Sequence, residues 1–243
     1  FVYALALENK YTPTSLVLDA PLVLDQGVDL KKWKPENYGK KFYGPSTLRV
    51  GLEKSRNLMT VRIAQNLGAD KVAKFSKDLK IYEDPEELLS ISLGSAETTL
   101  LNLTSAYSSF VNGGKLISPI IIDRIQDSEG ITIINNENRK CMNCDKISFT
   151  GNDYPQIEDD YEQVMSKQTA YQVTTILEGV IKRGTGKKLK DLQLNLAGKT
   201  GTTNENTDAW FIGFTSNLVI GVYVGMDNPE PLGKSETGSK AAL

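Results

Sequence analysis

Histidine is absent from all 243 residues of the sequence. This absence excludes Ser-His-Asp and Cys-His catalysis, and it removes the commonest metal ligand of proteins. If the protein is a hydrolase or an acyl-transfer enzyme, its general base must therefore be a lysine, an aspartate, a glutamate or a tyrosine.

Cysteine is scarce, since only Cys141 and Cys144 are present, in the order Cys-Met-Asn-Cys. One such pair supplies half of a zinc site, and no second pair or histidine completes it. A redox motif would normally open a helix after a strand, whereas this pair stands among Asn, Arg, Lys and Asp, as in a loop. The pattern predicts a local disulfide or two free thiols, with no metal and no cofactor.

Long apolar runs and an excess of one charge are also missing. No stretch approaches the ~20 apolar residues of a membrane span, and the segment that begins at Phe1 lacks the basic region and cleavage site of a signal peptide. The 28 basic and 30 acidic side chains give a formal net charge of -2, which argues against a nucleic-acid partner. One local basic cluster surrounds Trp33 and is interpreted as a solvated loop. Its members are Lys31, Lys32, Lys34, Lys40 and Lys41.

Apolar residues recur at about 3.6-residue spacing in much of the sequence, which predicts helices. The predicted helices cover residues 1–9, 47–54 after an N-cap at Ser46, 58–67, 70–79, 85–89, 97–111 and 167–183. Strands are predicted at 15–18, 193–198, 209–214 and 218–226, and a hairpin at 117–126 and 131–134, followed by a polar, irregular stretch at 135–163. The sum is an α+β fold in which a helical lobe packs on an antiparallel sheet, with a peripheral loop or hairpin insertion around residues 117–165.

The segment at residues 196–204, Leu-Ala-Gly-Lys-Thr-Gly-Thr-Thr-Asn, carries the first candidate chemistry. Gly198-Lys-Thr suggests a phosphate loop, but that motif needs a glycine where Gln193 stands. The favoured interpretation places Lys199-Thr200-Gly201 on a strand at the border of a cleft. There the lysine supplies positive charge, the threonine hydroxyl binds a carboxylate, and the glycine lets a ligand lie against the backbone.

A second candidate is Ser55-Arg56-Asn57, which lies between two predicted helices. A serine at such a place is more often an N-cap than a catalyst. However, active-site serine acyltransferases use the motifs Ser-x-x-Lys, Ser-x-Asn and Lys-Thr-Gly in that order. This logic suits a protein without histidine, because a lysine and a second serine share the proton transfer.

These motifs resemble those of the class A penicillin-binding proteins, which polymerise and cross-link peptidoglycan. The resemblance covers nearly the whole sequence and implies a serine β-lactamase/transpeptidase-like fold. It is carried by residues 54–62 around Ser-Arg-Asn, by the glycine-bearing turn at 93–97, by Arg-Gly-Thr-Gly at 183–186 and, most specifically, by residues 198–204 and 208–213.

One motif of the family is missing. In the family, Phe-Val-Tyr usually follows directly on Gly-Ser-x-Phe-Lys-Pro, which holds the nucleophile, whereas this sequence starts at Phe1-Val2-Tyr3 and has no serine followed three residues later by lysine. The resemblance therefore implies a transpeptidase domain that is incomplete at both ends, has no nucleophile of its own and is inactive alone. It implies a parent enzyme with a glycosyltransferase domain, located in the bacterial periplasm and anchored to the inner membrane only through a segment outside the sequence.

The resemblance also implies substrates and roles. The parent enzyme would act as a D-alanyl-D-alanine transpeptidase on peptidoglycan stem peptides, and β-lactams would mimic the D-Ala-D-Ala end. Ser55 would relay a proton to the leaving nitrogen, Asn57 would hydrogen-bond the substrate amide, and Lys199 would hold Ser55. We expect the Lys199 nitrogen about 2.7–3.5 Å from Ser55 Oγ, in a cleft toward which residues 1–9 point as a helix and into which Asn57 points.

The strand residues after Lys199 complete the implied site. Thr200 and Thr202 would face the substrate carboxylate along Gly201, and the Thr202 amide would contribute to an oxyanion hole. Thr203 either joins them in substrate binding or, with Asn204, only shapes the following turn.

Other interpretations remain open beside the transpeptidase. One is a binding module that kept the cleft and lost the nucleophile. Another is a β-lactamase-type hydrolase or sensor, although no dedicated carboxylate to activate water is evident. Trp210 and Phe211 are interpreted as core residues. Arg62 and Asp208 could be catalytic, but a structural ion pair or cap is the favoured interpretation.

Overall fold

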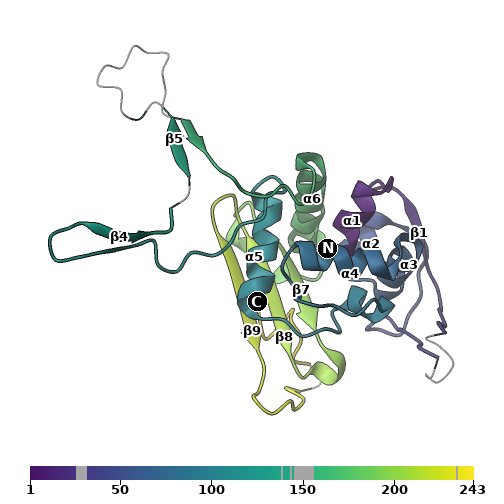
Figure 1. Ribbon diagram of the computed structural model, residues 1–243. Helices are drawn as coiled ribbons and strands as arrows, with labels where there is room; N and C mark the ends of the chain where they lie inside the picture. The colour runs from purple at the N-terminus through teal and green to yellow at the C-terminus, as the bar shows by residue number, and fades with distance from the viewer. Residues whose placement is uncertain (26–31, 138, 143, 145–155, 234) are drawn as a thin grey trace.

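The computed structural model describes residues 1–25, 32–137, 139–142, 144, 156–233 and 235–243 (Figure 1). Helices dominate one side of the body, and a three-stranded antiparallel sheet, in the order β7-β8-β9, forms the other. The helices are α1 (Val2–Glu8), α2 (Leu48–Glu53), α3 (Asn57–Leu67), α4 (Ala69–Asp78), α5 (Leu100–Val111) and α6 (Lys167–Arg183), with short 3-10 turns η1 (Leu89–Leu93), η2 (Lys187–Leu192) and η3 (Asn204–Asn206). This arrangement confirms the α+β class.

The sheet presents its edge strand β7 to the helical side. It consists of β7 (Ala197–Thr202), β8 (Ala209–Phe214) and β9 (Val219–Val224), with Lys199 opposite Ile212 on the neighbouring strand. Helix α6 packs against β7, and α5 lies on β8 and β9. A separate two-stranded ribbon pairs β1 (Leu16–Asp19) with β2 (Gly44–Thr47) and leads into α2.

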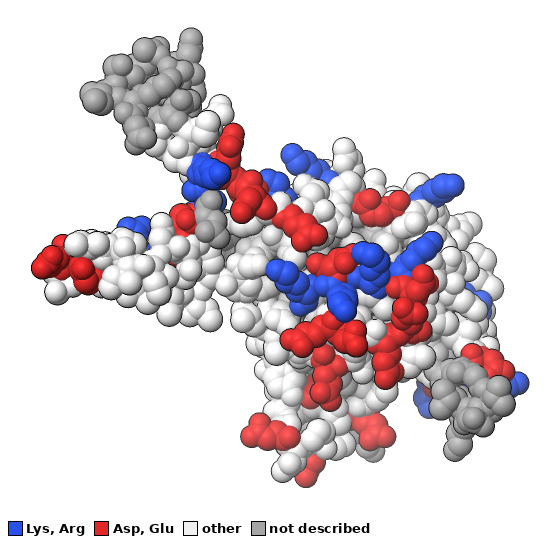
Figure 2. All heavy atoms as spheres, viewed as in Figure 1, with Lys and Arg blue, Asp and Glu red and all other residues white. Residues whose placement is uncertain are grey.

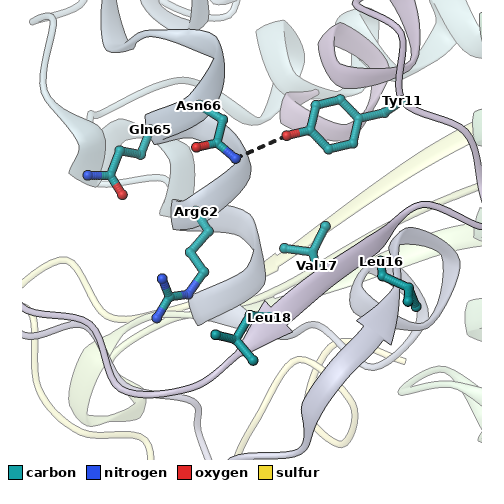
Figure 3. A pocket seen from close by; sticks show the side chains of 7 residues that line it. All are labelled: Tyr11, Leu16, Val17, Leu18, Arg62, Gln65 and Asn66. Carbon is teal, nitrogen blue, oxygen red and sulfur yellow. Dashed lines mark hydrogen bonds between the residues drawn. The ribbon is translucent and has the colours of Figure 1, made fainter.

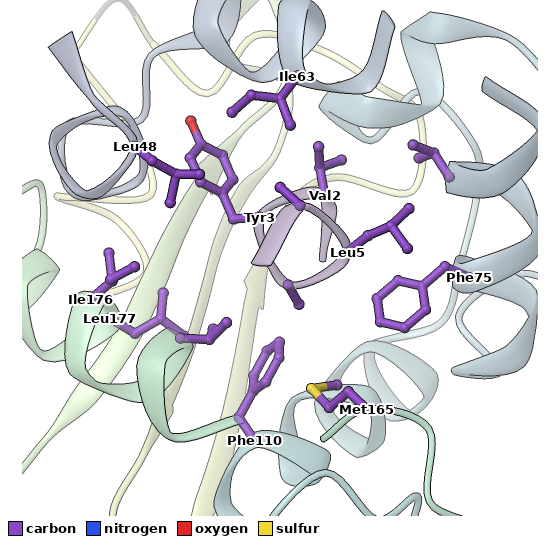
Figure 4. Close-up of a cluster of buried hydrophobic side chains, with 14 of the residues drawn as sticks. Val2, Tyr3, Leu5, Leu48, Ile63, Phe75, Phe110, Met165, Ile176 and Leu177 are labelled. Carbon is purple, nitrogen blue, oxygen red and sulfur yellow. The ribbon is translucent and has the colours of Figure 1, made fainter. Parts of the chain in front are cut away.

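Helix α1 forms the centre of the hydrophobic core. Its residues Val2, Tyr3, Ala4, Leu5 and Ala6 are all buried, as expected for a helix that is apolar on every side. Figure 4 shows α1 with its side chains directed toward several surrounding helices, and the contacts of α1 are with α3, α4 and α6. The core thus fixes the N-terminal helix relative to the elements that carry the candidate site.

An arm of two hairpins projects from the body (Figure 1). It contains β3 (Arg124–Gln126) paired with β4 (Thr132–Asn135), and β5 (Lys140–Met142) paired with β6 (Gln156–Glu158). Every residue of these four strands is exposed. The arm leaves and re-enters the body at one place, where the Leu116 amide donates to the Glu162 carbonyl at 2.8 Å.

The arm also carries the two cysteines and much exposed apolar surface. Cys141 and Cys144 form a disulfide, which is one of the two states predicted for them. Figure 2 shows acidic and basic side chains interspersed over the body, whereas the β3–β4 hairpin is mostly uncharged. The exposed apolar side chains of the arm include Ile121, Ile131, Ile133 and Ile157.

The strongly periodic helices follow the prediction apart from their ends, while one short helix and one strand do not. Ser46 lies within β2, and Thr47 is the N-cap of α2, because its hydroxyl accepts from the Val50 amide. The predicted helix at 97–111 begins at Leu100 after its N-cap Thr99. The short helix predicted at 85–89 is wrong, since the helical turn in this region is η1.

The strand predicted at 193–198 is also misplaced. Residues before it form η2, and Gln193 adopts a left-handed conformation (φ 53°) that no strand accommodates. Strand β7 therefore begins at Ala197 and continues through Thr202. The stretch at 135–163 is not wholly irregular, because β5 and β6 lie in it. The lysines around Trp33 are exposed as expected, except for Lys31, which lies outside the described residues.

Candidate active site

Ser55 and Lys199 meet although 144 residues separate them in the sequence. Lys199 Nζ donates a hydrogen bond to Ser55 Oγ at 2.8 Å and another to the carbonyl oxygen of Thr200 at 2.7 Å. The first distance lies within the predicted range and confirms the contact. A lysine ammonium in this position stabilises negative charge that develops on the serine oxygen.

Ser55 adopts a backbone conformation that is unusual for a residue with a side chain. Its φ of 54° lies in the left-handed region, which non-glycine residues occupy rarely and at a cost in conformational energy. Arg56, not Ser55, occupies the N-cap position of α3, and it makes no side-chain capping bond. The alternative in which Ser55 serves only as a helix cap is therefore wrong.

The surroundings of Lys199 change its acidity. The residue keeps some exposed surface, but its ammonium group is enclosed, and this burial lowers the pKa of Lys199 to about 8. The direction of residues 1–9 toward this lysine stays a prediction.

The threonines after Lys199 have partners within the protein. Thr200 is buried, and its hydroxyl shares a hydrogen bond of 2.7 Å with the Thr185 hydroxyl. Thr202 Oγ1 accepts from the Gly238 amide at 3.0 Å. Thr203 Oγ1 accepts from the Asp208 amide at 2.8 Å, so Thr203 shapes the turn between β7 and β8.

Neighbouring residues also constrain Gly201 and Asn57, two further residues of the predicted site. Gly201 lies opposite Trp210, and a Cβ atom at Gly201 would approach Trp210 Cβ to 3.1 Å. Asn57 is the first residue of α3, and its side-chain amide donates to the Glu36 carbonyl at 2.9 Å. Its predicted direction into the cleft stays a prediction.

The whole chain, residues 1–243, matches the family model described as the penicillin binding protein transpeptidase domain. The chain belongs to this family.

Proteins similar to this member of the transpeptidase family are much longer than it. Penicillin-binding protein 1A of Rickettsia bellii (strain RML369-C) is 43% identical over 246 residues, which cover 100% of this chain and 31% of the relative. Penicillin-binding protein 1A of Pseudomonas aeruginosa is 34% identical over 275 residues, which cover 100% of this chain and 33% of the relative. The chain therefore spans about a third of the length of these relatives.

Solved structures of the family share the fold. Penicillin-binding protein 1A from Haemophilus influenzae superposes with a TM-score of 0.82 at 29% identity, over 98% of this chain and 38% of that one. PonA1 from Mycobacterium tuberculosis in complex with penicillin V gives a TM-score of 0.75 at 22% identity, over 98% of this chain and 63% of that one. The predicted transpeptidase-like fold is confirmed.

The middle residue of the family's Ser-x-Asn motif, Arg56, reaches a buried network that the sequence did not indicate. Its guanidinium lies 3.5 Å from a carboxylate oxygen of Asp19 and stacks on Tyr43, 3.1 Å from the ring centroid. Asp19 is fully buried and accepts from the Asn37 side chain at 2.7 Å, while Asn37 Oδ1 accepts from the Leu58 amide at 3.3 Å. This network contacts Arg56 in the middle of the Ser55–Asn57 junction and Leu58 directly after it.

A second buried carboxylate, Glu53, was also not predicted from the sequence. It is 2% exposed and forms an ion pair with Arg183 at the end of α6. Nothing in the sequence joins residues 130 positions apart. The only available signal is the place of Glu53 at the end of α2, two residues before Ser55.

The remaining candidates have structural surroundings. Arg62 donates to the carbonyls of Ala20 and Pro21 at 3.1 and 2.9 Å, and Asp208 accepts from the Tyr223 hydroxyl at 3.1 Å. Among the described residues, hydrogen bonds thus take the place of the ion pair or cap expected for Arg62 and Asp208.

The two aromatic residues predicted for the core differ in burial. Phe211 is buried, as expected. Trp210 is half-buried and packs on Tyr223, with 4.7 Å between the ring centroids.

Two pockets lie elsewhere on the body. A shallow pocket of about 250 Å³ is lined by Tyr11, Arg62 and Asn66 beside β1, where the Asn66 side chain donates to the Tyr11 hydroxyl (Figure 3). A larger one, about 580 Å³, is formed by residues between Ile81 and Asn102. Neither is lined by Ser55 or Lys199, so the cleft expected around them stays a prediction.

The described residues contain neither a cluster of metal-binding side chains nor a membrane-spanning helix. No group of three or more Cys, Asp or Glu side chains is arranged to hold a metal ion in the described part of the chain. Within the same residues, no helix combines the length and apolar character needed to cross a bilayer.

Proposed function

We propose that these residues form part of a D-alanyl-D-alanine transpeptidase that cross-links peptidoglycan stem peptides within a longer synthase. The observation that carries the proposal is the hydrogen bond from Lys199 Nζ to Ser55 Oγ at 2.8 Å. Membership in the transpeptidase family and the likeness to proteins named penicillin-binding protein 1A support it.

The proposed reaction proceeds in two steps on a nucleophilic serine supplied by a segment outside these 243 residues. First, the serine oxygen forms an ester with the carbonyl carbon of the penultimate D-alanine, while the bond to the terminal D-alanine nitrogen breaks and that nitrogen receives a proton. Then an amine of a second stem peptide attacks the ester, forms the cross-linking amide and releases the serine oxygen, which regains a proton.

In this reaction Ser55 relays the proton to the leaving nitrogen. The Lys199 ammonium stabilises negative charge on Ser55 Oγ during the transfer. Its pKa of about 8 keeps most of the lysine protonated at neutral pH. Asn57 hydrogen-bonds the substrate amide.

Strand β7 binds the substrate along its edge. Thr200 and Thr202 are the proposed partners of the terminal carboxylate beside Gly201, and the Thr202 amide contributes to the oxyanion hole. Thr203 acts through the turn that it shapes. Each of the two hydroxyls must exchange its present partner, Thr185 or the Gly238 amide, or share it with the substrate.

β-Lactams are the proposed inhibitors, because their acyl group mimics the D-Ala-D-Ala end and stalls at the ester stage. A family member, PonA1, has been solved in complex with penicillin V. We further propose that the complete protein works in the bacterial periplasm and is held at the inner membrane by a segment outside this sequence, and that residues 117–165 are a peripheral insertion.

Labelling with a fluorescent penicillin tests the proposal. The complete polypeptide should give a fluorescent band that survives denaturing electrophoresis, whereas the 243-residue chain alone should give none. Lys199→Met in the complete polypeptide should lower the labelling rate by on the order of a hundredfold or more, as for the loss of one charge-stabilising donor. The exposed Lys188→Met, in η2, is the matched control and should label like the parent.

Other outcomes would favour the alternatives. A complete polypeptide that never labels would favour a binding module without a nucleophile. Rapid loss of the label would favour a hydrolase. A stable band on the 243-residue chain alone would contradict the assignment of the nucleophile to another segment.

A further inference from the structure

We infer that Glu53 and Arg183 are positioning residues that set the geometry of the Ser55–Lys199 contact. Neither reaches the proposed reacting atoms. Both lie at helix ends, Glu53 at the end of α2 and Arg183 at the end of α6. The inference rests on the proposed transpeptidase function. It adds the contacts that hold the helical side of the site against strand β7.

The ion pair is built for fixed geometry. Arg183 Nε donates to Glu53 Oε2 at 2.9 Å and Arg183 Nη2 donates to Glu53 Oε1 at 2.5 Å, in a two-pronged arrangement that fixes distance and orientation together. These hydrogen bonds raise the pKa of Arg183. The Glu53 side chain is 3% exposed, and a buried carboxylate without such a partner is strongly destabilising.

The backbone of α6 leaves space for this carboxylate. A Cβ atom at Gly179 would collide with Glu53 Oε1, and one at Gly184 would collide with the Glu53 carbonyl oxygen. Arg49 adds a weaker ion pair to Glu53 at 3.8 Å. The end of α6 is thus shaped around Glu53.

One side of the pair leads directly to Ser55. Glu53 precedes Ser55 by two residues, and Lys54 Nζ between them donates to the Arg183 carbonyl at 2.5 Å. The strained turn at Ser55, with φ at 54°, therefore begins at a segment fastened to Arg183 through two consecutive side chains.

The other side of the pair leads to Lys199. Two residues after Arg183, the Thr185 hydroxyl is hydrogen-bonded to the Thr200 hydroxyl at 2.7 Å. Thr200 follows Lys199, and its carbonyl accepts from Lys199 Nζ at 2.7 Å. The end of α6 therefore contacts the Ser55 segment and the Lys199 segment, and the Ser55–Lys199 hydrogen bond closes a ring of contacts between α2, α6 and β7.

A ring of this kind has a testable consequence. Glu53→Gln keeps the shape of the side chain but places an amide NH₂ against an Arg183 nitrogen. The pair therefore loses one of its two hydrogen bonds and the negative charge of the carboxylate. A displacement of about 1 Å at reacting groups can lower a rate by about a hundredfold. We expect a ten- to hundredfold decrease in the acylation rate constant of the complete polypeptide, with an unchanged dissociation constant for the noncovalent β-lactam complex.

The experiment measures stopped-flow acylation of the complete polypeptide by a fluorescent penicillin, which separates the two constants. Glu178→Gln is the matched control, because Glu178 pairs with Lys182 at 2.7 Å on the exposed face of the same helix. Thr185→Val tests the other side of the ring without touching the ion pair. Thr185→Ser keeps the hydroxyl and should restore most of the rate.

The outcomes distinguish a failure of this inference from a failure of the proposed transpeptidase function. If the parent polypeptide does not acylate, the proposed function fails. If the parent acylates and Glu53→Gln acylates at the rate of Glu178→Gln, the inference is wrong. If circular dichroism shows that Glu53→Gln does not fold, the Thr185→Val and Thr185→Ser variants test the inference instead. A Thr185→Val that acylates slowly with an unchanged dissociation constant, and is rescued by Thr185→Ser, supports the inference. Equal acylation rate constants for both, or a loss confined to the dissociation constant, overturn it.

Discussion

At the residue scale, Ser55 combines a functional hydroxyl with a strained backbone. Its φ of 54° places a side-chain-bearing residue in the left-handed region, where an L-residue loses about 1–2 kcal/mol relative to right-handed conformations. Arg56 follows it and is held by Asp19 and Tyr43. The strain persists because contacts on both sides of the residue fix the turn.

A pair of substitutions measures this strain. Ser55→Gly and Ser55→Ala both remove the hydroxyl, but only glycine relaxes the left-handed backbone. The glycine variant should therefore have a free energy of unfolding about 1 kcal/mol higher than that of the alanine variant, in urea denaturation followed by circular dichroism. An alanine variant as stable as the glycine variant would show that the turn stores no strain at this residue.

Lys199 makes stability depend on pH. Burial lowers its pKa from 10.5 to about 8, so between these values the unfolded chain binds more protons than the folded one. The folded state gains stability as pH rises through this window, while below about pH 8 the cost of burying the charge is present in full. In Lys199→Met that cost is absent at every pH.

The stability advantage of Lys199→Met over the parent should accordingly shrink by roughly 2–3 kcal/mol between pH 7 and pH 10.5. Urea denaturation of both proteins at the two pH values measures it. The exposed Lys188→Met should show no such change. An advantage that stays constant with pH would mean that Lys199 titrates near its ordinary value.

Sequence reasoning found these two residues but not the groups that hold them. The motif order identified Ser55 and Lys199 because chemistry requires those residue types together. Glu53, Arg183 and Asp19 carry no such signal, since their role depends on partners that only the fold brings near. A buried carboxylate looks like any exposed one until its surroundings are known.

At the scale of elements, both ends of α6 contact distant parts of the chain. The sequence pattern of the helix does not indicate these contacts. Its N-cap Ser166 accepts from the Thr169 amide at 3.1 Å, and both its own amide and its hydroxyl donate to Glu8 at the end of α1. Partial burial of Glu8 opposes its ionisation, but the hydrogen bonds outweigh it and lower the Glu8 pKa. The start of α6 thus contacts α1 and its end contacts Ser55 and β7.

Loss of this cap should be measurable. Ser166→Ala should lower the free energy of unfolding by about 1–2 kcal/mol, because it removes the cap and one hydrogen bond to a carboxylate. Thr14→Ala, at an exposed hydroxyl in the loop before β1, serves as the control and should change stability by less than about 0.5 kcal/mol. If the two variants unfold at the same urea concentration, the cap contributes nothing.

The predicted elements were correct where a single face of a helix is buried, as in α3 and α6. The predictions were wrong or incomplete where contacts with distant parts of the chain determine the local structure. Residues 193–198 were predicted as a strand, yet Leu194 is exposed and Gln193 ends η2 in a left-handed conformation. Helix α1 was predicted as a helix, but its burial on every side depends on neighbours from distant segments.

At the scale of the whole molecule, the arm and the body differ in how their residues are buried. The core clusters include no described residue between 117 and 163, and isolated two-stranded ribbons contribute little stability of their own in water. The arm begins and ends beside one bridge between Lys115 and Gln163. The body should therefore fold without it.

Replacing residues 118–160 by a short Gly-Ser linker tests this independence. The shortened protein should unfold in one cooperative transition with a melting temperature within a few degrees of the parent, because no described core side chain is removed. Differential scanning calorimetry measures both properties. A broad transition or a fall of more than about 10 °C would show that the arm supports the core.

The ring that joins α2, α6 and β7 also has a consequence for how the protein reaches its native state. Its contacts span 130 and 144 residues of sequence, so they raise the contact order, and proteins rich in such non-local contacts fold more slowly than those with local ones. On the ribosome, where synthesis runs from the N-terminus, the nascent chain can form α1 to α4 long before Lys199 emerges. Until β7 has been synthesised and docked, Ser55 has no ammonium beside it. Acylation competence should consequently appear as one of the last events of folding, after most of the helical secondary structure is already in place.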